Sequence, residues 1–201
     1  MANEYVKREE LKATLELSGQ TFAQEDIDAA LLAASRGIDE ACGRRFYAHS
    51  GAATARYFTP RSATLIAIDD LYELTTLKTD QDGDGTFEET WTLNTGFVAE
   101  PLNAAADGWP WTRFCIHPHA NKSFPYYYPR SVEVTGKWGW AAVPGTIKQA
   151  TTILASKLLK RAREAPFGIV SIGIDVGATA RIARTDPDIS FLISPYVREK
   201  P

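Results

Sequence analysis

The chain has 201 residues, a formal net charge of −3, and 44% hydrophobic and 23% charged residues. This length and composition predict one globular domain with an elaborate insertion, and they exclude a disordered chain, a collagen-like repeat and a disulfide-dense miniprotein. The near-neutral balance also disfavours a generally basic protein that coats nucleic acid. The charge is nevertheless uneven: the balance is −2 over residues 1–60, −5 over 61–145 and +4 over 146–201. An acidic middle and a basic end indicate surfaces with different roles.

The first region, residues 4–46, is predicted to be helical. Its opening, MANEYVKREELKATLEL, is charged where a signal peptide would be apolar, and no stretch approaches the roughly 20 apolar residues of a membrane span. A first helix is expected over residues 5–17. A second is expected from apolar residues that recur at helical spacing, with Gly43 closing it in a left-handed conformation. These residues are Ile27, Ala30, Leu31, Ala34, Ile38 and Ala41.

The second region, residues 52–140, is predicted to be β-rich. Short runs of β-branched and aromatic residues predict strands over residues 55–59, 65–68, 71–79, 87–93, 111–116 and 131–135. Residues 80–85 read as the turn of a hairpin. Residues 101–110 and 117–129 are predicted to be loops because they are rich in proline and polar residues.

The third region contains a long helix over residues 144–164, with Pro144 suited to a first helical position. Residues 167–201 are predicted to form an extended tail in which Asp186 and Pro187 begin a short last helix that ends near Ile193. The expected fold class is therefore α+β within one domain over residues 1–201. It is a small helical bundle of two N-terminal helices, one long C-terminal helix and a short last helix, with an antiparallel β-rich insertion between helices two and three.

The acidic turn is the sharpest local pattern. It matches positions 1, 3, 5, 6 and 9 of a calcium-binding loop, where carboxylate oxygens surround a hard cation. The matching residues are Asp80, Asp82, Asp84, Gly85 and Glu88. Trp91 stands at position 12 in place of the bidentate glutamate, and the flanks are strands rather than helices. A polar hairpin turn and a calcium site both remain open interpretations. No cofactor is expected, with calcium at this turn as the alternative.

Other chemistry is sparsely represented. The sequence has no GxSxG, HExxH, Walker or CxxC motif, so an enzyme is not expected. Cys115, His117 and His119 are residue types that hold zinc, but no fourth ligand is evident and ordinary loop residues are the favoured interpretation. The free thiols Cys42 and Cys115 fit a reducing cytoplasm, with a single disulfide as the alternative.

Aromatic residues gather between positions 109 and 140, where they could stack on nucleic-acid bases beside Arg113, Arg130 and Lys137. The favoured interpretation is a sheet core with a protein interface, because the local charge is not strongly basic. The cluster comprises Trp109, Trp111, Phe114, Phe124, Tyr126, Tyr127, Tyr128, Trp138 and Trp140.

Four segments in this order resemble the head–tail connector, or adaptor, proteins of long-tailed bacteriophages and prophages. The segments are ACGRRFY (41–47), TDQDGDGTFEETW (79–91), VPGTIKQATTILASKLLKR (143–161) and ARIARTDPDISFLISPYVR (180–198). The resemblance implies a structural virion protein that forms a ring, commonly a dodecamer, beneath the portal protein. Such a ring extends the DNA channel and joins the portal to a stopper or tail-completion protein. The β-rich insertion is longer than in the smallest members of the family.

The resemblance also implies a location in the virion neck, with assembly in the host bacterial cytoplasm and no membrane contact. DNA would pass through the channel without sequence-specific binding. By this likeness residues 168–198 would be a tail that docks on the portal. Its apolar anchors would be Ile189, Phe191, Leu192, Ile193 and Tyr196. Two alternatives remain: a DNA-binding module that uses the basic C-terminal third, and a calcium-dependent binding module that uses Asp80, Asp82, Asp84 and Glu88.

Overall fold

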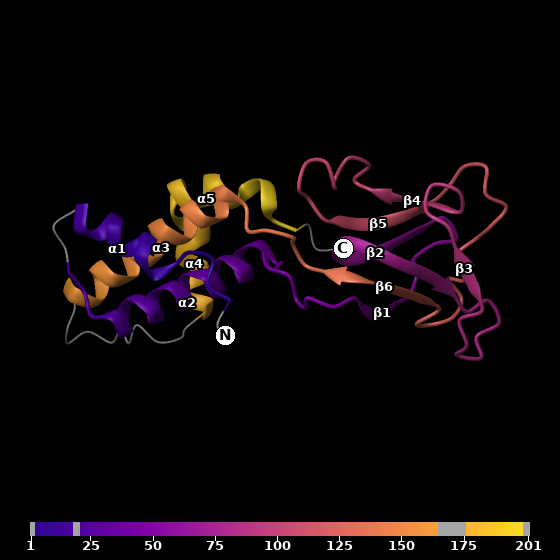
Figure 1. Cartoon of the computed structure of the whole chain (residues 1–201), viewed down its shortest axis with the longest axis horizontal. Coiled ribbons are helices and arrows are strands. Elements are labelled where there is room, and N and C mark those ends of the chain that lie inside the picture. Colours follow the sequence, from indigo (N-terminus) through magenta and orange to yellow (C-terminus); the bar gives the residue numbers. More distant parts are fainter. Residues whose placement is uncertain (1–2, 18–20, 165–175, 199–201) are drawn as a thin grey trace. The chain divides into compact units, whose positions relative to one another are not determined.

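The computed structural model describes residues 3–17, 21–164 and 176–198. Contacts divide the chain into two compact units. One unit contains Met1–Phe46 together with Val143–Pro201, so both ends of the chain contribute to it, and the other contains Tyr47–Ala142. Figure 1 shows the helices gathered in the first unit and the strands in the second. Each unit is described below by itself.

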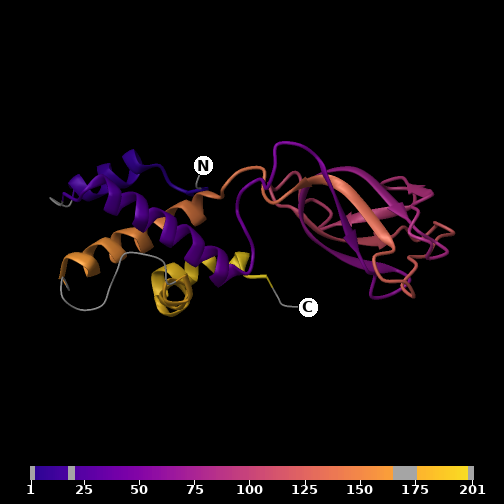
Figure 2. The same ribbon diagram turned by 90° about the horizontal axis from the view of Figure 1, so that it is seen from below.

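The helical unit contains five α-helices within the described residues. Their bounds are α1 Arg8–Leu17, α2 Gln24–Cys42, α3 Gly145–Glu164, α4 Val176–Thr185 and α5 Pro187–Ile193, and a short 3-10 turn, η1, follows over Ser194–Tyr196. Helix α2 packs against α1, α3 and α4, while α5 packs against α3 and α4. In both Figure 1 and Figure 2 these helices form one group. The core is therefore built around α2, with its apolar stripe Ile27, Ala30, Leu31, Ala34 and Ile38 fully buried.

Two helix ends follow from local chemistry that the sequence predicts. Gly43 caps α2 at φ 66°, a left-handed conformation that glycine adopts without strain. Asp186 caps α5, where its side chain accepts a hydrogen bond from the backbone N–H of Ile189 and Pro187 takes the first helical position. The start of α2 differs, because the helix follows Ala23 and no side chain caps it.

The second unit is a six-stranded antiparallel sheet. The strands are β1 Thr54–Phe58, β2 Leu65–Thr79, β3 Glu89–Trp91, β4 Phe97–Glu100, β5 Trp111–Ile116 and β6 Val132–Trp138. Their spatial order is β1-β6-β2-β5-β4, which Figure 1 shows, with β3 also paired to β2. The long strand β2 thus pairs with β6 along one edge and with β5 and β3 along the other.

A hydrophobic core lies within this unit and fixes the register of the strands. Strand β6 alternates strictly between buried and partly buried residues, as expected for a strand with one face on a core. Trp138, Phe97, Phe114 and Phe124 are among its fully buried side chains. Gly136 permits the close pairing of β6 with β2, because a Cβ there would lie 2.4 Å from the carbonyl oxygen of Glu73.

The predicted fold class requires correction. The described residues form an α+β structure with five helices and a six-stranded antiparallel sheet, not a small helical bundle with one long helix. Helices α2 and α3 are of similar length, 19 and 20 residues, so there is no single long helix. The sheet is a compact unit with its own core rather than an appendage of the bundle.

The C-terminal tail also differs from the prediction. Residues 176–185 were expected to be extended but form helix α4. Helix α4 faces α2 with small residues, Thr179, Ala180 and Ala183, all of them buried. A Cβ on Gly37 of α2 would lie 2.5 Å from the Thr179 methyl carbon, so the two helices approach closely. Helix α4 was not predicted because its contact with α2 is made by small residues rather than by large aliphatic ones.

Candidate functional site

Three of the four segments that carry the family resemblance lie in the helical unit and contact one another there. The backbone N–H of Arg198 donates to the carbonyl oxygen of Cys42 at 2.8 Å. The rings of Phe46 and Tyr196 meet edge to face with centroids 5.6 Å apart. The hydroxyl of Thr146, in α3, donates to the hydroxyl oxygen of Tyr196 at 2.8 Å. The C-terminal segment is therefore folded back onto the end of α2 and the start of α3.

The five predicted anchors of the docking tail fall into two groups. Ile189 and Ile193 are four residues apart on one face of α5, and both are buried within the unit. Phe191 lies on the opposite face and is 79% exposed. Leu192 and Tyr196 are half-buried. Helical periodicity thus places Ile189 and Ile193 in the chain's own core and places Phe191 on the exposed face of α5, where it is accessible to a partner.

An ion pair fixes the start of α5. Lys157 of α3 and Asp186 form a salt bridge. The hydrogen bond from Lys157 lowers the pKa of Asp186 most; burial opposes this effect, and the Ile189 N–H adds to the lowering. The Asp186 carboxylate therefore joins α5 to α3 while it caps its own helix. This arrangement holds the exposed face of α5 in a defined position.

The acidic turn between β2 and β3 closes on itself. The two carboxylate oxygens of Asp80 accept hydrogen bonds from the backbone N–H groups of Gly83, at 2.7 Å, and Gly85, at 2.9 Å. Asp84 accepts one from Thr86 at 2.7 Å. Gly83 and Gly85 have φ values of 82° and 91°, which favour glycine. Part of the pattern that resembles a calcium loop therefore serves to form the turn itself.

The same turn brings carboxylates together. Within the described residues, Asp80, Asp82 and Glu88 can each offer one oxygen so that the three atoms lie within 4.8 Å of one another. Asp84, the fourth predicted ligand, is outside this group. Burial raises the pKa of Asp80, but the N–H groups of Gly85 and Gly83 and a hydrogen bond from Asp82 outweigh it, so the pKa lies below its usual value. Trp91, at the position of the missing glutamate, is buried in the sheet core.

A polar cavity of about 310 Å³ beside this turn was not found from the sequence. Lys122 donates to one oxygen of Glu89 at 2.7 Å, and Gln81 donates to the other at 3.0 Å. Burial raises the pKa of Glu89, but the hydrogen bond and positive charge of Lys122 outweigh it, with a smaller contribution from Gln81, and the pKa is lowered. Lys122 lies 33 residues from Glu89 along the chain, so no local motif joins them.

Four of the nine residues in the aromatic cluster are buried. Phe114, Phe124, Trp138 and Trp140 are buried, and the rings of Trp91 and Phe124 stack at 4.8 Å. Buried rings have no free face on which a base could stack. The exposed members are Tyr126, Tyr127 and Tyr128.

Some basic side chains of the C-terminal third make contacts within the helical unit. Lys157 pairs with Asp186, and Arg184 donates to the carbonyl oxygen of Glu40 at 2.8 Å. Lys160 and Arg161, near the end of α3, are exposed. Part of the basic charge of residues 146–201 is therefore held in contacts within the helical unit.

A buried carboxyl group, also missed from the sequence, ties the N-terminal segment to α2. The Tyr5 hydroxyl donates to Asp39, and the Phe46 N–H donates to the Tyr5 hydroxyl oxygen at 2.9 Å. Burial raises the pKa of Asp39 to about 6, although the hydrogen bond from Tyr5 and the charges of Arg36 and Arg45 act in the opposite direction. An Asp on the polar edge of a helical stripe gives no sign of burial in the sequence.

No family model, curated protein or solved structure matches this chain in comparisons with known proteins. In the described part of the chain, no helix combines the length and the apolar character needed to cross a membrane. Among these same residues, the zinc ligands weighed from the sequence, Cys115, His117 and His119, do not form a metal-binding group. Cys42 and Cys115 are free thiols.

Proposed function

We propose that this protein is a structural subunit of a bacteriophage neck. In this role it forms a ring that joins the portal to the stopper or tail-completion protein and extends the DNA channel. It acts by assembly, with no catalytic step, and resides in the virion neck after assembly in the host cytoplasm. The order of the four sequence segments suggests the role, and the packing of the helical unit supports it.

One observation carries the proposal. Residues 41–46, 143–161 and 180–198 are far apart in the sequence, yet they lie in one helical unit and are joined by backbone, hydroxyl and ring contacts. Their convergence gives the motif order a structural basis, because the segments depend on one another to bury their apolar faces.

The arrangement also suits a subunit that meets several neighbours. The helical unit leaves Phe191 at its surface, and the sheet unit exposes Tyr126 and Tyr127, so each unit presents aromatic residues of the kind enriched at protein interfaces. A ring subunit needs two different lateral surfaces as well as contacts above and below. Docking of the C-terminal segment on the portal remains a prediction, and the buried Ile189 and Ile193 would support it by positioning the exposed face of α5.

The direct test mixes the purified full-length chain with a portal ring encoded beside it and images the product by electron microscopy. The proposal expects a ring of this chain stacked on the portal along a common axis. A chain that neither forms a ring nor joins the portal, under conditions in which the portal itself is intact, would refute the proposal.

A calcium-dependent binding module is the second candidate, favoured by the group of Asp80, Asp82 and Glu88 oxygens within 4.8 Å. Calcium would bind this turn through hard oxygen ligands, and the missing bidentate glutamate would make the site weak. Both roles are compatible, because a cation in the β2–β3 turn would act within the sheet unit.

A further inference from the structure

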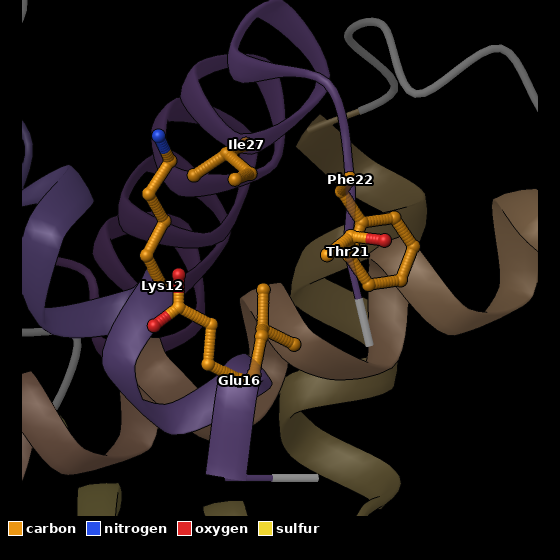
Figure 3. A pocket seen from close by; sticks show the side chains of 6 residues that line it. Lys12, Glu16, Thr21, Phe22 and Ile27 are labelled. Carbon is orange, nitrogen blue, oxygen red and sulfur yellow. The ribbon is translucent and has the colours of Figure 1, made fainter. Parts of the chain in front are cut away.

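The helical unit has a small pocket beside the N-terminal part of α2. It has a volume of about 160 Å³ and is lined by Lys12, Leu15, Glu16, Thr21, Phe22 and Ile27. Figure 3 shows Lys12 and Glu16 on one side of it and Thr21 and Phe22 on the other. Leu15 and Ile27 are buried beneath the pocket and Phe22 is half-buried, so the Phe22 ring supplies its accessible apolar surface, while Lys12 and Glu16 stand at the rim. The pocket thus suits an apolar side chain that carries a polar neighbour.

Phe191 has the complementary character. Its ring is 79% exposed on α5, the largest exposed fraction among the large hydrophobic side chains of the described residues. Asp188, also exposed, precedes it by three residues and therefore lies on the same side of the helix. Salt bridge and cap contacts at Asp186 hold this helix in place, so the ring projects from a fixed support. An anchored aromatic ring loses little freedom on binding and is typical of an interface hot spot.

The pocket and Phe191 occupy different parts of the same unit. Phe22 at the pocket lies under Arg163, near the end of α3, with the guanidinium carbon 6.0 Å from the ring centroid. The C-terminal segment instead runs back along α3, from Lys157, which meets Asp186, to Thr146, which meets Tyr196. Because α5 is fixed there, Phe191 cannot fill the pocket of its own chain. Contact between the two requires a second copy.

We propose that Phe191 of one copy inserts into the pocket lined by Leu15, Phe22 and Ile27 of the next copy, with Asp188 facing Lys12. The inference rests on the proposed ring, for which it names the lateral contact. Two different surfaces meet, so the contact is heterologous, and repetition about an axis closes a ring. The apolar insertion supplies affinity, and the charge pair mainly orients the copies, since Glu16 at the same rim partly offsets Lys12.

Directional cross-linking tests the geometry. Lys12→Cys and Asp188→Cys are made separately in a Cys115→Ser background, because Cys115 is partly exposed whereas Cys42 is buried. A short bis-maleimide reagent is used, because a Lys–Asp pair can hold Cα atoms further apart than the roughly 7 Å that a disulfide tolerates. Mixing the two variants should give a cross-linked heterodimer well in excess of either homodimer. Equal yields of all three products, or no product at submillimolar protein, would overturn the proposal.

Substitution tests the energetics. Phe191→Ala should weaken self-association of the full-length chain by about tenfold or more in sedimentation velocity, because an exposed anchor ring is lost. The control is Leu102→Ala, a change at a 70% exposed residue of the sheet unit, which should leave association unchanged. Lys12→Asp and Asp188→Lys should each weaken association, and combining them should restore it. Equal effects of Phe191→Ala and Leu102→Ala would overturn the inference.

Failure of this inference can be told apart from failure of the proposed ring. A ring that forms on the portal with Phe191→Ala as readily as with the unchanged chain overturns the contact and leaves the proposed function standing. If Phe191→Ala abolishes portal binding but leaves the heterodimeric cross-link intact, the ring contact is refuted and α5 is assigned to the portal. Directional cross-links from a chain that never joins a portal support the contact and count against the neck function.

Discussion

The buried carboxyl group of Asp39 should make the stability of the helical unit depend on pH in a direction opposite to that of an ordinary salt-bridged aspartate. Its pKa is raised from 3.8 to about 6, with burial as the largest cause. The folded protein therefore holds this proton more tightly than the unfolded chain does. Well below pH 4 both states are protonated, and well above pH 6 both are ionised, so stability is lost as pH rises between these limits.

The size of the effect follows from the difference in proton affinity. Each tenfold change in affinity is worth about 1.4 kcal/mol, so moving the pKa from 3.8 to about 6 lowers the free energy of unfolding by about 3 kcal/mol in all, of which about 2 kcal/mol falls between pH 4 and pH 7. The carboxyl is 9% exposed, so solvent screening does not remove most of this cost. Asp39→Asn keeps an oxygen acceptor for the Tyr5 hydroxyl but cannot ionise, so it should abolish this dependence.

The assay is urea unfolding of the full-length chain and of Asp39→Asn at intervals from pH 4 to pH 7. Asp39→Asn also loses an ion pair with Arg36, which shifts the whole curve, so the decisive quantity is the slope against pH rather than the offset. The difference in unfolding free energy should grow in favour of the variant by about 2 kcal/mol across the window. Asp107→Asn, at an exposed loop position, controls for the loss of one carboxylate. Parallel curves for Asp39→Asn and the unchanged chain would refute the reasoning.

Three further predictions concern close contacts and the acidic turn. Gly37→Ala should destabilise the helical unit by about 1–3 kcal/mol in urea unfolding, because its Cβ would lie 2.5 Å from the Thr179 methyl carbon, and Thr179→Ala should recover part of the loss. Gly139→Ala should destabilise the sheet unit by at least as much, because φ at Gly139 is 97° and a Cβ there would lie 2.1 Å from the Tyr47 carbonyl oxygen. An unfolding midpoint that does not change in the Gly37→Ala or Gly139→Ala variant would contradict the corresponding prediction. Calorimetry should detect weak calcium binding that Asp80→Asn abolishes, and heat that persists in this variant would place the ion elsewhere.

The sequence predicts elements best where a single physical signal dominates. The apolar stripe of α2 and its glycine cap were read correctly, because large aliphatic residues at helical spacing and a glycine at the end are local signals. Strand β4, Phe97–Glu100, was not predicted because four residues are too few to show a period. Residues 65–79 were expected as two strands and form one, β2, with register shifts where its pairing with β6 is irregular.

Site residues were harder to predict because their roles depend on contacts between distant segments. The spacing of Asp80, Asp82 and Asp84 is visible in the sequence, but the hydrogen bonds that Gly83 and Gly85 donate to Asp80 depend on backbone conformation. The five tail anchors could be found as apolar residues, whereas their division into buried and exposed members required knowledge of which face of α5 meets α3. Burial of Asp39 depends on a tyrosine 34 residues away.

The folding of the C-terminal segment bears on the proposed ring assembly. A tail that becomes ordered only on its partner must lose its conformational freedom at the moment of binding, which lowers affinity. Here the salt bridge between Lys157 and Asp186, the cap of α5 and the burial of Ile189 and Ile193 order residues 186–193 within the chain itself. Much of the conformational freedom of this segment is therefore lost when the chain folds rather than when it binds, and Phe191 lies on a rigid helix. Such preorganisation favours a contact repeated identically around a ring, because each copy then meets its neighbour in the same geometry.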